Sequence, residues 1–297
     1  MIYTKPLLTL AQQIDTLKQR GLIIDNEAEA AAILGRVSYF RLADYWRPME
    51  TDRESHTFRP DTHFHDIIEI YQFDTELKQI IFNAILQIEV VVRSKMIRFF
   101  TERHDPFWFA DESLSEDADC FQSNIMHIRR EIQRSQEDYI REHFERYDTP
   151  EFPPVWKTLE VLTLGTLSKL YSNFSDHTAK DLIAREFGLF QHLILGSWLA
   201  SMTVLRNKCA HHARVWNRRF PIMPILPRRT EHPWITNRNV LPYKLYVQLC
   251  YIAYWLRSFN ATSSFTNDIK ALLTKYPVVD PMAMGFQRYW QDEPLWQ

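Results

Sequence analysis

The feature that most constrains this chain is a long stretch, from Phe64 to about Arg103, that contains neither glycine nor proline. Its apolar residues recur at steps of three and four, namely Ile67, Ile70, Tyr71, Leu77, Ile80, Ile81, Ala84, Ile85, Ile88, Val92 and Met96. This spacing indicates a long central helix that faces the core, with a bend near Asp74. Glycine is scarce throughout, at 6 of 297 residues, so we expect an all-α fold.

Capping and breaking residues divide the rest of the chain into further helices. Thr9 is expected to cap a helix that ends at Gly21, and Asn26 to cap a second one. A charged helix is expected over 122–147, ended by the proline-rich segment 148–154. Further helices are expected over 155–174, 178–188, 190–215, 243–259 and 264–276, with joints at Gly165 and Gly188 and an irregular segment at 219–243.

These elements suggest three regions along the chain. We expect an N-terminal helical region over 1–62 and a main helical domain over 63–220, with an inserted charged segment near 104–150. The remainder, 221–297, should begin as a proline-rich excursion and end in C-terminal helices that pack on the same core. A composition of 45% hydrophobic and 24% charged residues is ordinary for a globular chain of this length.

The cysteines and the termini bear on the compartment. Cys120, Cys209 and Cys250 are odd in number and form no CxxC pair, which argues against a disulfide framework or a zinc cluster. The N-terminus lacks the pattern of a secretion signal, and the weakly polar stretch 193–205 is shorter than the roughly 20 residues of a membrane-spanning helix. We therefore expect a cytoplasmic protein without a membrane segment.

Positive charge is concentrated in one part of the chain. The whole protein has a formal net charge of −2, but the segment 206–238 has a single acid, Glu231. Its eight cations are Arg206, Lys208, Arg214, Arg218, Arg219, Arg228, Arg229 and Arg238. Together with Trp216 and Trp234 for base stacking, this segment favours a nucleic-acid site. Single-stranded RNA fits better than duplex DNA, because the chain has no helix-turn-helix or zinc-finger spacing.

The start of this segment, RNKCAHHARVWNR, combines residue types that can cleave RNA. At about 100° per residue, a helix would place Arg206, Asn207 and His211 on one broad face. Leu205, Cys209 and His212 would then lie toward the packed side. An arginine can hold a phosphate, a histidine can transfer a proton near neutral pH, and an amide can orient either. With the ribose 2′-hydroxyl as nucleophile, no metal or cofactor is needed, and the products carry a 2′,3′-cyclic phosphate and a 5′-hydroxyl.

Structural explanations exist for each of these residues. Cations often lie in the last turns of a helix, where they complement the helix dipole and bind free carbonyl groups. His212 should point away from His211 and is interpreted as a supporting residue. A metal at the paired histidines is disfavoured, because His192 and His232 lack ligand-like spacing with them.

Structural roles are also expected for residues outside the motif. Glu89 and Arg93 have the i, i+4 spacing of a structural ion pair. Six aromatic residues in helical segments are assigned to the core: Tyr39, Phe40, Tyr45, Trp46, Trp198 and Trp255.

Several segments together resemble a known family. In order they are KPLLTLAQQIDTLKQRGLII, VSYFRLADYW, IYQFDTELKQII, ILQIEVVVRSKM, TLGTLSKLY and LRNKCAHHARVWNR. Over roughly 5–220, this order resembles the abortive-infection (Abi) family of bacterial phage-defence proteins, the AbiD/AbiF-like group. The last segment is similar to the R-x-x-x-x-H signature of the higher-eukaryote and prokaryote nucleotide-binding (HEPN) superfamily.

The resemblance implies a fold, an activity and partners. Similar proteins are HEPN-type helical bundles, commonly dimeric and metal-independent endoribonucleases, in which two facing motifs make one composite site. The signature arginine matches Arg206, the next polar residue Asn207 and the signature histidine His211. This chain has one copy of the motif, so the resemblance implies a homodimer. It also implies host shutdown during phage infection, as in toxin–antitoxin systems, and for some relatives a structured non-coding RNA as partner.

Our leading hypothesis is therefore a homodimeric endoribonuclease with Arg206 and His211 as catalytic residues. Asn207 and His212 would support them, and the predicted RNA contacts are Lys208, Arg214, Trp216, Arg218 and Arg219. A second hypothesis is a non-catalytic RNA-binding or scaffold protein that holds a structured RNA on the same surface. A third is a protein-binding inhibitor without affinity for RNA.

Overall fold

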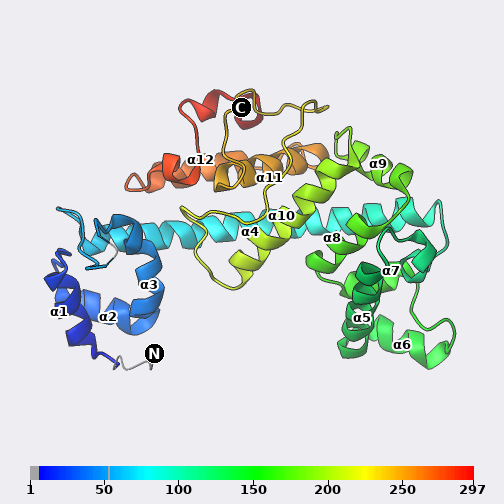
Figure 1. Cartoon of the computed structure of the whole chain (residues 1–297), viewed down its shortest axis with the longest axis horizontal. Coiled ribbons are helices and arrows are strands. Elements are labelled where there is room, and N and C mark those ends of the chain that lie inside the picture. Colours follow the sequence, from blue (N-terminus) through cyan, green and yellow to red (C-terminus); the bar gives the residue numbers. More distant parts are fainter. Residues whose placement is uncertain (1–6, 53) are drawn as a thin grey trace. The chain divides into compact units, whose positions relative to one another are not determined.

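The computed structural model describes residues 7–52 and 54–297 of the chain (Figure 1). Within these residues the regular elements are α-helices and short 3-10 helices, and no β-strand occurs. The predicted all-α class is therefore confirmed. No helix in the described part is both long enough and apolar enough to cross a membrane.

The chain forms two compact units. One contains Met1–Lys78 and Ile269–Asp280, and the other contains Gln79–Asp268 and Pro281–Gln297. The three regions suggested by the sequence stay a prediction. Short 3-10 helices connect the larger elements: η1 (Arg47–Met49), η2 (Trp108–Ala110), η3 (Glu112–Leu114), η4 (Leu159–Val161), η5 (Pro281–Met284), η6 (Trp290–Asp292) and η7 (Pro294–Trp296).

The N-terminal unit begins with three short helices. They are α1 (Leu10–Gln19), α2 (Glu27–Val37) and α3 (Tyr39–Trp46), and they are followed by the start of α4 (Phe64–Thr101) and joined by most of α12 (Phe265–Lys275). Thr9 caps α1 in a capping box with Gln12, and the side chain of Asn26 accepts the backbone N–H of Glu29 at the start of α2. Both predicted caps are confirmed.

A buried polar group fastens α3 to α4. The Tyr45 hydroxyl donates to Asp74 Oδ2 over 2.6 Å, and Lys78 Nζ lies 3.0 Å from the same oxygen. These two partners satisfy the carboxylate of Asp74, which is wholly buried. The helix α4 continues through Asp74 without a break. Tyr45 and Trp46 lie in the core as predicted, but Phe40 on the same helix is 78% exposed, which corrects its assignment to the core.

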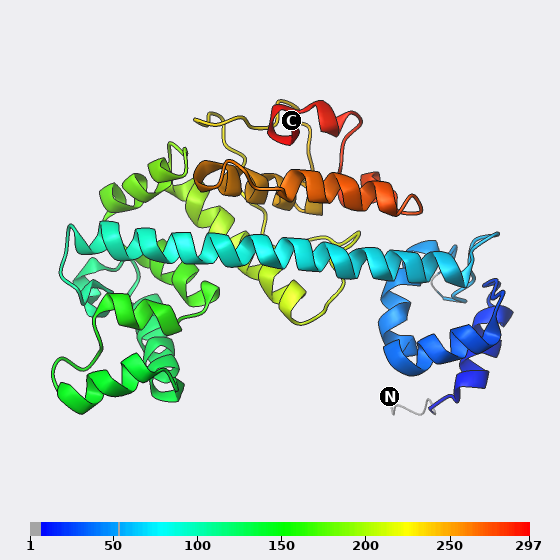
Figure 2. The same ribbon diagram turned by 180° about the vertical axis from the view of Figure 1, so that it is seen from behind.

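The larger unit contains the rest of α4 and seven further helices. These are α5 (Ala118–Arg134), α6 (Asp138–Arg146), α7 (Val155–Thr158), α8 (Leu164–Asn173), α9 (His177–Glu186), α10 (His192–Ala210) and α11 (Leu245–Phe259). Figure 2 shows the C-terminal half of α4 lying across α10, with α11 on the side that carries the C-terminal segment. The segment between Ala210 and Leu245 has no regular element, which confirms the irregular segment predicted at 219–243.

The core of this unit is built on aromatic rings. Trp198 of α10 is fully buried and packs against Tyr251 and Trp255 of α11. Its indole N–H donates to the carbonyl of Ile225 over 2.8 Å, which fastens the irregular segment to α10. Trp198 and Trp255 are therefore core residues, as predicted. The structural pair is also confirmed: Arg93 lies 3.1 Å from Glu89 and donates to the Leu162 carbonyl over 3.2 Å.

Two predicted helices are each broken in the structure. The charged helix over 122–147 divides at Ser135, whose backbone is extended and whose side chain accepts the N–H of Glu137 over 3.2 Å. This local bond competes with the helical one. The helix over 155–174 divides before Thr163, which caps α8 by accepting the N–H of Thr166.

The two glycines expected at joints have different roles. Gly188 has a φ of +67° and does separate α9 from α10. Gly165 instead lies inside α8, and a Cβ there would come within 3.3 Å of Thr203 Cγ2 on α10. Close packing of α10 on α8, rather than a joint, therefore accounts for Gly165.

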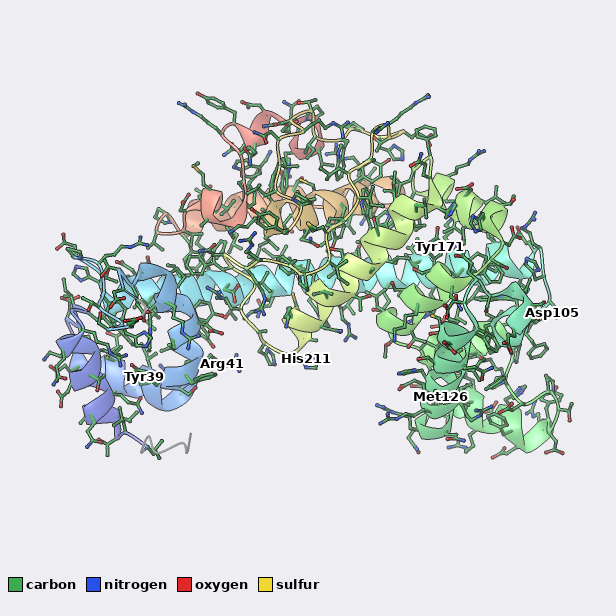
Figure 3. All side chains as sticks on the ribbon, viewed as in Figure 1. Tyr39, Arg41, Asp105, Met126, Tyr171 and His211 are labelled. Carbon is green, nitrogen blue, oxygen red and sulfur yellow. The ribbon has the colours of Figure 1, made fainter. Side chains whose placement is uncertain are left out.

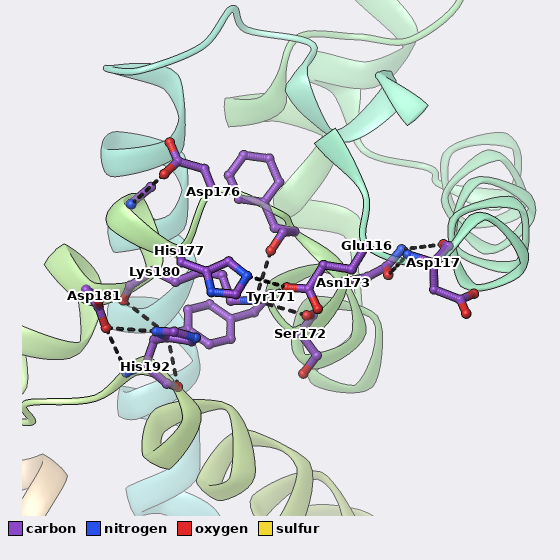
Figure 4. Close-up of polar contacts among 12 residues, drawn as sticks. Glu116, Asp117, Tyr171, Ser172, Asn173, Asp176, His177, Lys180, Asp181 and His192 are labelled. Carbon is purple, nitrogen blue, oxygen red and sulfur yellow. Dashed lines mark hydrogen bonds and ion pairs between the residues drawn. The ribbon is translucent and has the colours of Figure 1, made fainter. Parts of the chain in front are cut away.

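A polar network ties α8, α9 and α10 together (Figure 4). Lys180 is buried, and its ammonium donates to the carbonyls of Ser172 and Phe174 and to Glu116 Oε1. Asp181 of α9 accepts two bonds from His192, the first residue of α10: one from the backbone N–H over 3.0 Å and one from ring Nδ1 over 2.8 Å. Asp181 therefore satisfies the first backbone N–H of α10 from a neighbouring helix, which helps to fix the helix that carries RNKCA.

Candidate functional site

The candidate motif lies at the end of α10, where the helix stops earlier than predicted. The helix was expected to reach Val215 but ends at Ala210. His212 has a φ of +53°, and the bonds from His212 N to Cys209 O (3.1 Å) and from Ala213 N to Lys208 O (2.9 Å) form a Schellman motif. Glycine usually occupies the position of His212. His212 is thus part of the turn that ends the helix.

This ending determines where the three motif residues lie. Arg206 and Asn207 are in the last helical turns, and His211 is the C-cap residue, with its N–H bonded to the Asn207 carbonyl over 3.0 Å. Asn207 and His211 are exposed and Arg206 is half-buried. His211 lies at the free end of α10 (Figure 3). Leu205 and Cys209 are buried and anchor the helix from its other side, as expected.

Arg206 is held against an aromatic ring. Its guanidinium carbon lies 5.7 Å from the centre of the Phe82 ring on α4. Its Nε atom is enclosed and has no hydrogen-bond partner within residues 7–52 and 54–297. A cation over a ring face is attracted by the ring electrons, so Phe82 restricts the positions open to the guanidinium. No carboxylate in the described part of the chain forms an ion pair with Arg206 or His211.

The predicted RNA contacts differ in their surroundings. Lys208 is half-buried on the last turn of α10. Arg218 donates to the Arg214 carbonyl over 3.1 Å, and exposed Arg219 lies 4.3 Å from the centre of the Tyr243 ring. Among the described residues, no acid pairs with Lys208, Arg218 or Arg219. Arg214 lies 5.9 Å from the ring of Trp216.

The two tryptophans expected to stack on bases are not at the surface. Trp216 is 5% exposed and Trp234 is 7% exposed, and Trp234 stacks on core residue Trp198. Their rings serve the packing of the irregular segment, so the predicted stacking role of both is wrong for this conformation. Stacking needs a ring face that a base can reach.

The basic segment also does not form one patch. Arg229 lies over Phe190, just before α10 begins, and Arg238 donates to the Arg228 carbonyl over 3.3 Å. Arg206 is near the other end of α10, about 25 Å away at 1.5 Å per residue. The cations that surround the motif are therefore Lys208, Arg214, Arg218 and Arg219, without the three later arginines.

Sequence reasoning missed two residues beside the motif. Phe82 was not among the core-facing positions predicted for the central helix, and nothing in the local sequence linked it to Arg206. Lys244 lay outside the basic segment, but its ammonium donates to Asn217 Oδ1 over 3.1 Å and to the Ala283 carbonyl over 2.7 Å. Burial, together with the nearby cations Arg219 and Arg214, lowers the pKa of Lys244.

Metal-type ligands gather elsewhere. In the described part of the chain, the one grouping of three such side chains is His65, Asp66 and Glu69, at the surface of α4. His211 and His212 belong to no grouping of this kind within the same residues.

Comparisons with known proteins point to one family. A family model described as Abi-like protein matches residues 32–217, which is more than half of the chain and includes Arg206 and His211. Comparisons with curated proteins and with solved structures gave no significant match.

Proposed function

This chain belongs to the Abi-like protein family, whose name points to abortive infection in phage defence, and we propose that it is a metal-independent endoribonuclease. Its substrate would be single-stranded RNA, and its reactive groups the guanidinium of Arg206 and the imidazole of His211. The two residues act in a site that a second copy of the chain completes.

One observation carries the proposal: an arginine and a histidine meet solvent at the same helix end and lack acidic partners. Here neither Arg206 nor His211 forms an ion pair within the described residues, and Asn207 beside them is exposed. A phosphate group would supply the missing negative charge.

The chemistry follows from the residue types. The 2′-oxygen of the ribose attacks the adjacent phosphorus, and the bond from phosphorus to the 5′-oxygen of the next nucleotide breaks. His211 accepts the proton of the 2′-hydroxyl or gives one to the leaving 5′-oxygen, which typically accelerates a reaction 10²–10⁴-fold. Arg206 holds the non-bridging oxygens, on which charge increases in the transition state. The products carry a 2′,3′-cyclic phosphate and a 5′-hydroxyl.

The surface of α4 beside the motif supports a second copy as partner. From Gln79 to Ser94 the two charged residues, Glu89 and Arg93, are buried and paired, and every exposed residue is uncharged. We call these exposed residues the neutral face of α4: Gln79, Asn83, Leu86, Gln87, Val90 and Ser94. Leu86 is 45% exposed and Val90 60%. Depletion of charge around exposed aliphatic residues is typical of the centre of an interface.

The experiment that tests the proposal is RNA cutting in EDTA. Purified wild-type protein should cut single-stranded RNA, whereas His211→Ala and Arg206→Ala should not, although both variants keep the wild-type circular dichroism spectrum and melting temperature. His65→Ala removes another exposed histidine and serves as the matched control, which should cut at the wild-type rate. Equal cutting by wild type and His211→Ala would refute the proposal.

Binding without cutting is the second candidate function. Lys208, Arg218 and Arg219 have no acidic partners within the described residues, which favours binding of an anionic strand whether or not it is cut. In that case wild-type protein would retain a structured RNA intact, and His211→Ala would leave the affinity nearly unchanged. A protein that neither binds nor cuts RNA at moderate salt would instead support a protein-binding inhibitor.

A further inference from the structure

Two cations outside the helical motif are brought together by backbone pairing. The N–H of Phe220 donates to the Tyr243 carbonyl over 2.8 Å, which places the segment containing Arg219 beside the one containing Lys244. Arg219 then lies over the Tyr243 ring, at 4.3 Å from its centre. The two side chains come from positions far apart in the sequence and converge on one part of the surface.

Lys244 is fixed in place rather than loosely solvated. Its ammonium donates to Asn217 Oδ1 and to the Ala283 carbonyl, which uses two of its three N–H donors. Its stem packs on Gly285, whose φ is +92°, and a Cβ at that glycine would come within 2.6 Å of Lys244 Cβ. One ammonium donor remains for another acceptor.

Two arginines add positive charge around Lys244. Burial and the coulombic effect of Arg219 and Arg214 lower the pKa of Lys244. Within residues 7–52 and 54–297, no carboxylate forms an ion pair with Lys244 or Arg219. Holding Lys244 beside Arg219 is unfavourable because like charges repel, and a bound anion would relieve that cost.

We propose that Arg219 and Lys244 form a clamp for one backbone phosphate of a single-stranded RNA, an inference that rests on the proposed function of the Arg206 and His211 site. Arg219 offers a planar set of N–H donors that matches two phosphate oxygens, and Lys244 offers a fixed point charge. The clamp binds the strand backbone, so it adds affinity without preference for sequence.

The clamp is tested by the salt dependence of RNA binding in a protein that does not cut. The measurements use the full chain carrying His211→Ala and a fluorescently labelled single-stranded RNA, in EDTA, over a series of KCl concentrations. Adding Arg219→Gln or Lys244→Met should weaken binding and reduce the slope of log affinity against log salt, by about 0.7 in total when both residues are replaced, the change expected when a protein neutralises one phosphate fewer. Arg288→Gln is the matched control, because Arg288 also lies over a tyrosine, Tyr289, at 5.0 Å.

The outcomes separate the clamp from the nuclease. An unchanged slope in Arg219→Gln, an equal loss of affinity in Arg288→Gln, or no RNA binding at all would overturn the clamp. Lys244→Met keeps the stem on Gly285, and if that variant fails to fold, Arg219→Gln decides. Because binding is measured in the His211→Ala background, failure of wild-type protein to cut RNA would refute the nuclease and leave the result on the clamp intact.

Discussion

The guanidinium of Arg206 lies 5.7 Å from the centre of the Phe82 ring, and this interaction joins the last turns of α10 to α4. The relationship gives Arg206 a defined position although its Nε has no hydrogen-bond partner in the described part of the chain. Phe82 therefore acts as a positioning residue for the proposed phosphate-binding arginine.

Replacing Phe82 should lower the rate of cutting. A cation–ring interaction contributes about 1 kcal/mol, so Phe82→Leu should reduce kcat/KM about five- to tenfold. Phe82→Tyr keeps the ring face and should remain close to wild type. Single-turnover cutting rates measure the effect, and melting temperatures show whether the fold is intact. Equal rates for Phe82→Leu and wild type would contradict a positioning role.

A charge on the neutral face of α4 should separate two copies of the chain. Val90→Glu would bury a carboxylate on each side of the proposed interface, at a cost of several kcal/mol if it stays charged. Sedimentation velocity should then show a monomer, and RNA cutting should be lost with the dimer. Met126→Glu changes another exposed residue, 61% exposed on α5, and should leave both unchanged. A Val90→Glu protein that remains dimeric would place the interface elsewhere.

Glycine should replace His212 without loss of cutting. A left-handed residue other than glycine costs about 1 kcal/mol, so His212→Gly should keep or raise the free energy of unfolding by up to about 1 kcal/mol. His212→Val should lower it by about 1–2 kcal/mol, since a β-branched residue is strained at this φ. Urea denaturation measures both. Loss of cutting in a folded His212→Gly protein would instead assign the His212 imidazole to the reaction.

Acid should lower the free energy of unfolding by protonating the carboxylate of Asp176. Burial alone would raise the pKa of this carboxyl, but bonds from Arg103, the N–H of Ala179 and His104 outweigh it and hold the pKa at about 2. Because the folded pKa is below the ordinary value of 3.8, the charged form stabilises the fold above about pH 4. That contribution, about 2 kcal/mol, is lost as the pH falls from 4 to 2.

The measurement compares wild type with Asp176→Asn, which removes the charge but can still cap α9. At pH 7 the free energy of unfolding of the variant should be about 2 kcal/mol lower than that of wild type, and the two values should converge near pH 2. A difference that stays constant over this range would show that the charge is not the source of the stabilisation.

The sequence predicts elements whose signals are local. Thr9 and Asn26 cap their helices as expected, because a capping residue and its partner lie within three positions. The long period of apolar residues likewise locates α4. The candidate motif could also be found locally, because Arg206, Asn207 and His211 lie within six positions of one another in the sequence.

Elements decided by distant contacts or by unusual residues are not predicted. The end of α10 depends on His212, which adopts a left-handed conformation that glycine usually adopts. Because the sequence has no glycine at this position, the end of the helix could not be predicted from it. Trp216 was predicted to stack on bases because it lies in the basic segment, but its ring is buried. Phe82 and Lys244 join the site through tertiary contacts, which leave no trace in the neighbouring sequence.

The most direct test of the account is the chemical nature of the ends that the wild-type protein leaves on a single-stranded RNA cut in EDTA. If Arg206 and His211 promote attack by the 2′-hydroxyl, the fragments will carry a 2′,3′-cyclic phosphate and a 5′-hydroxyl, and a 2′-deoxy sugar at the cut position will block cutting. Fragments with a 3′-hydroxyl and a 5′-phosphate, or cutting that persists at the 2′-deoxy position, would contradict the account.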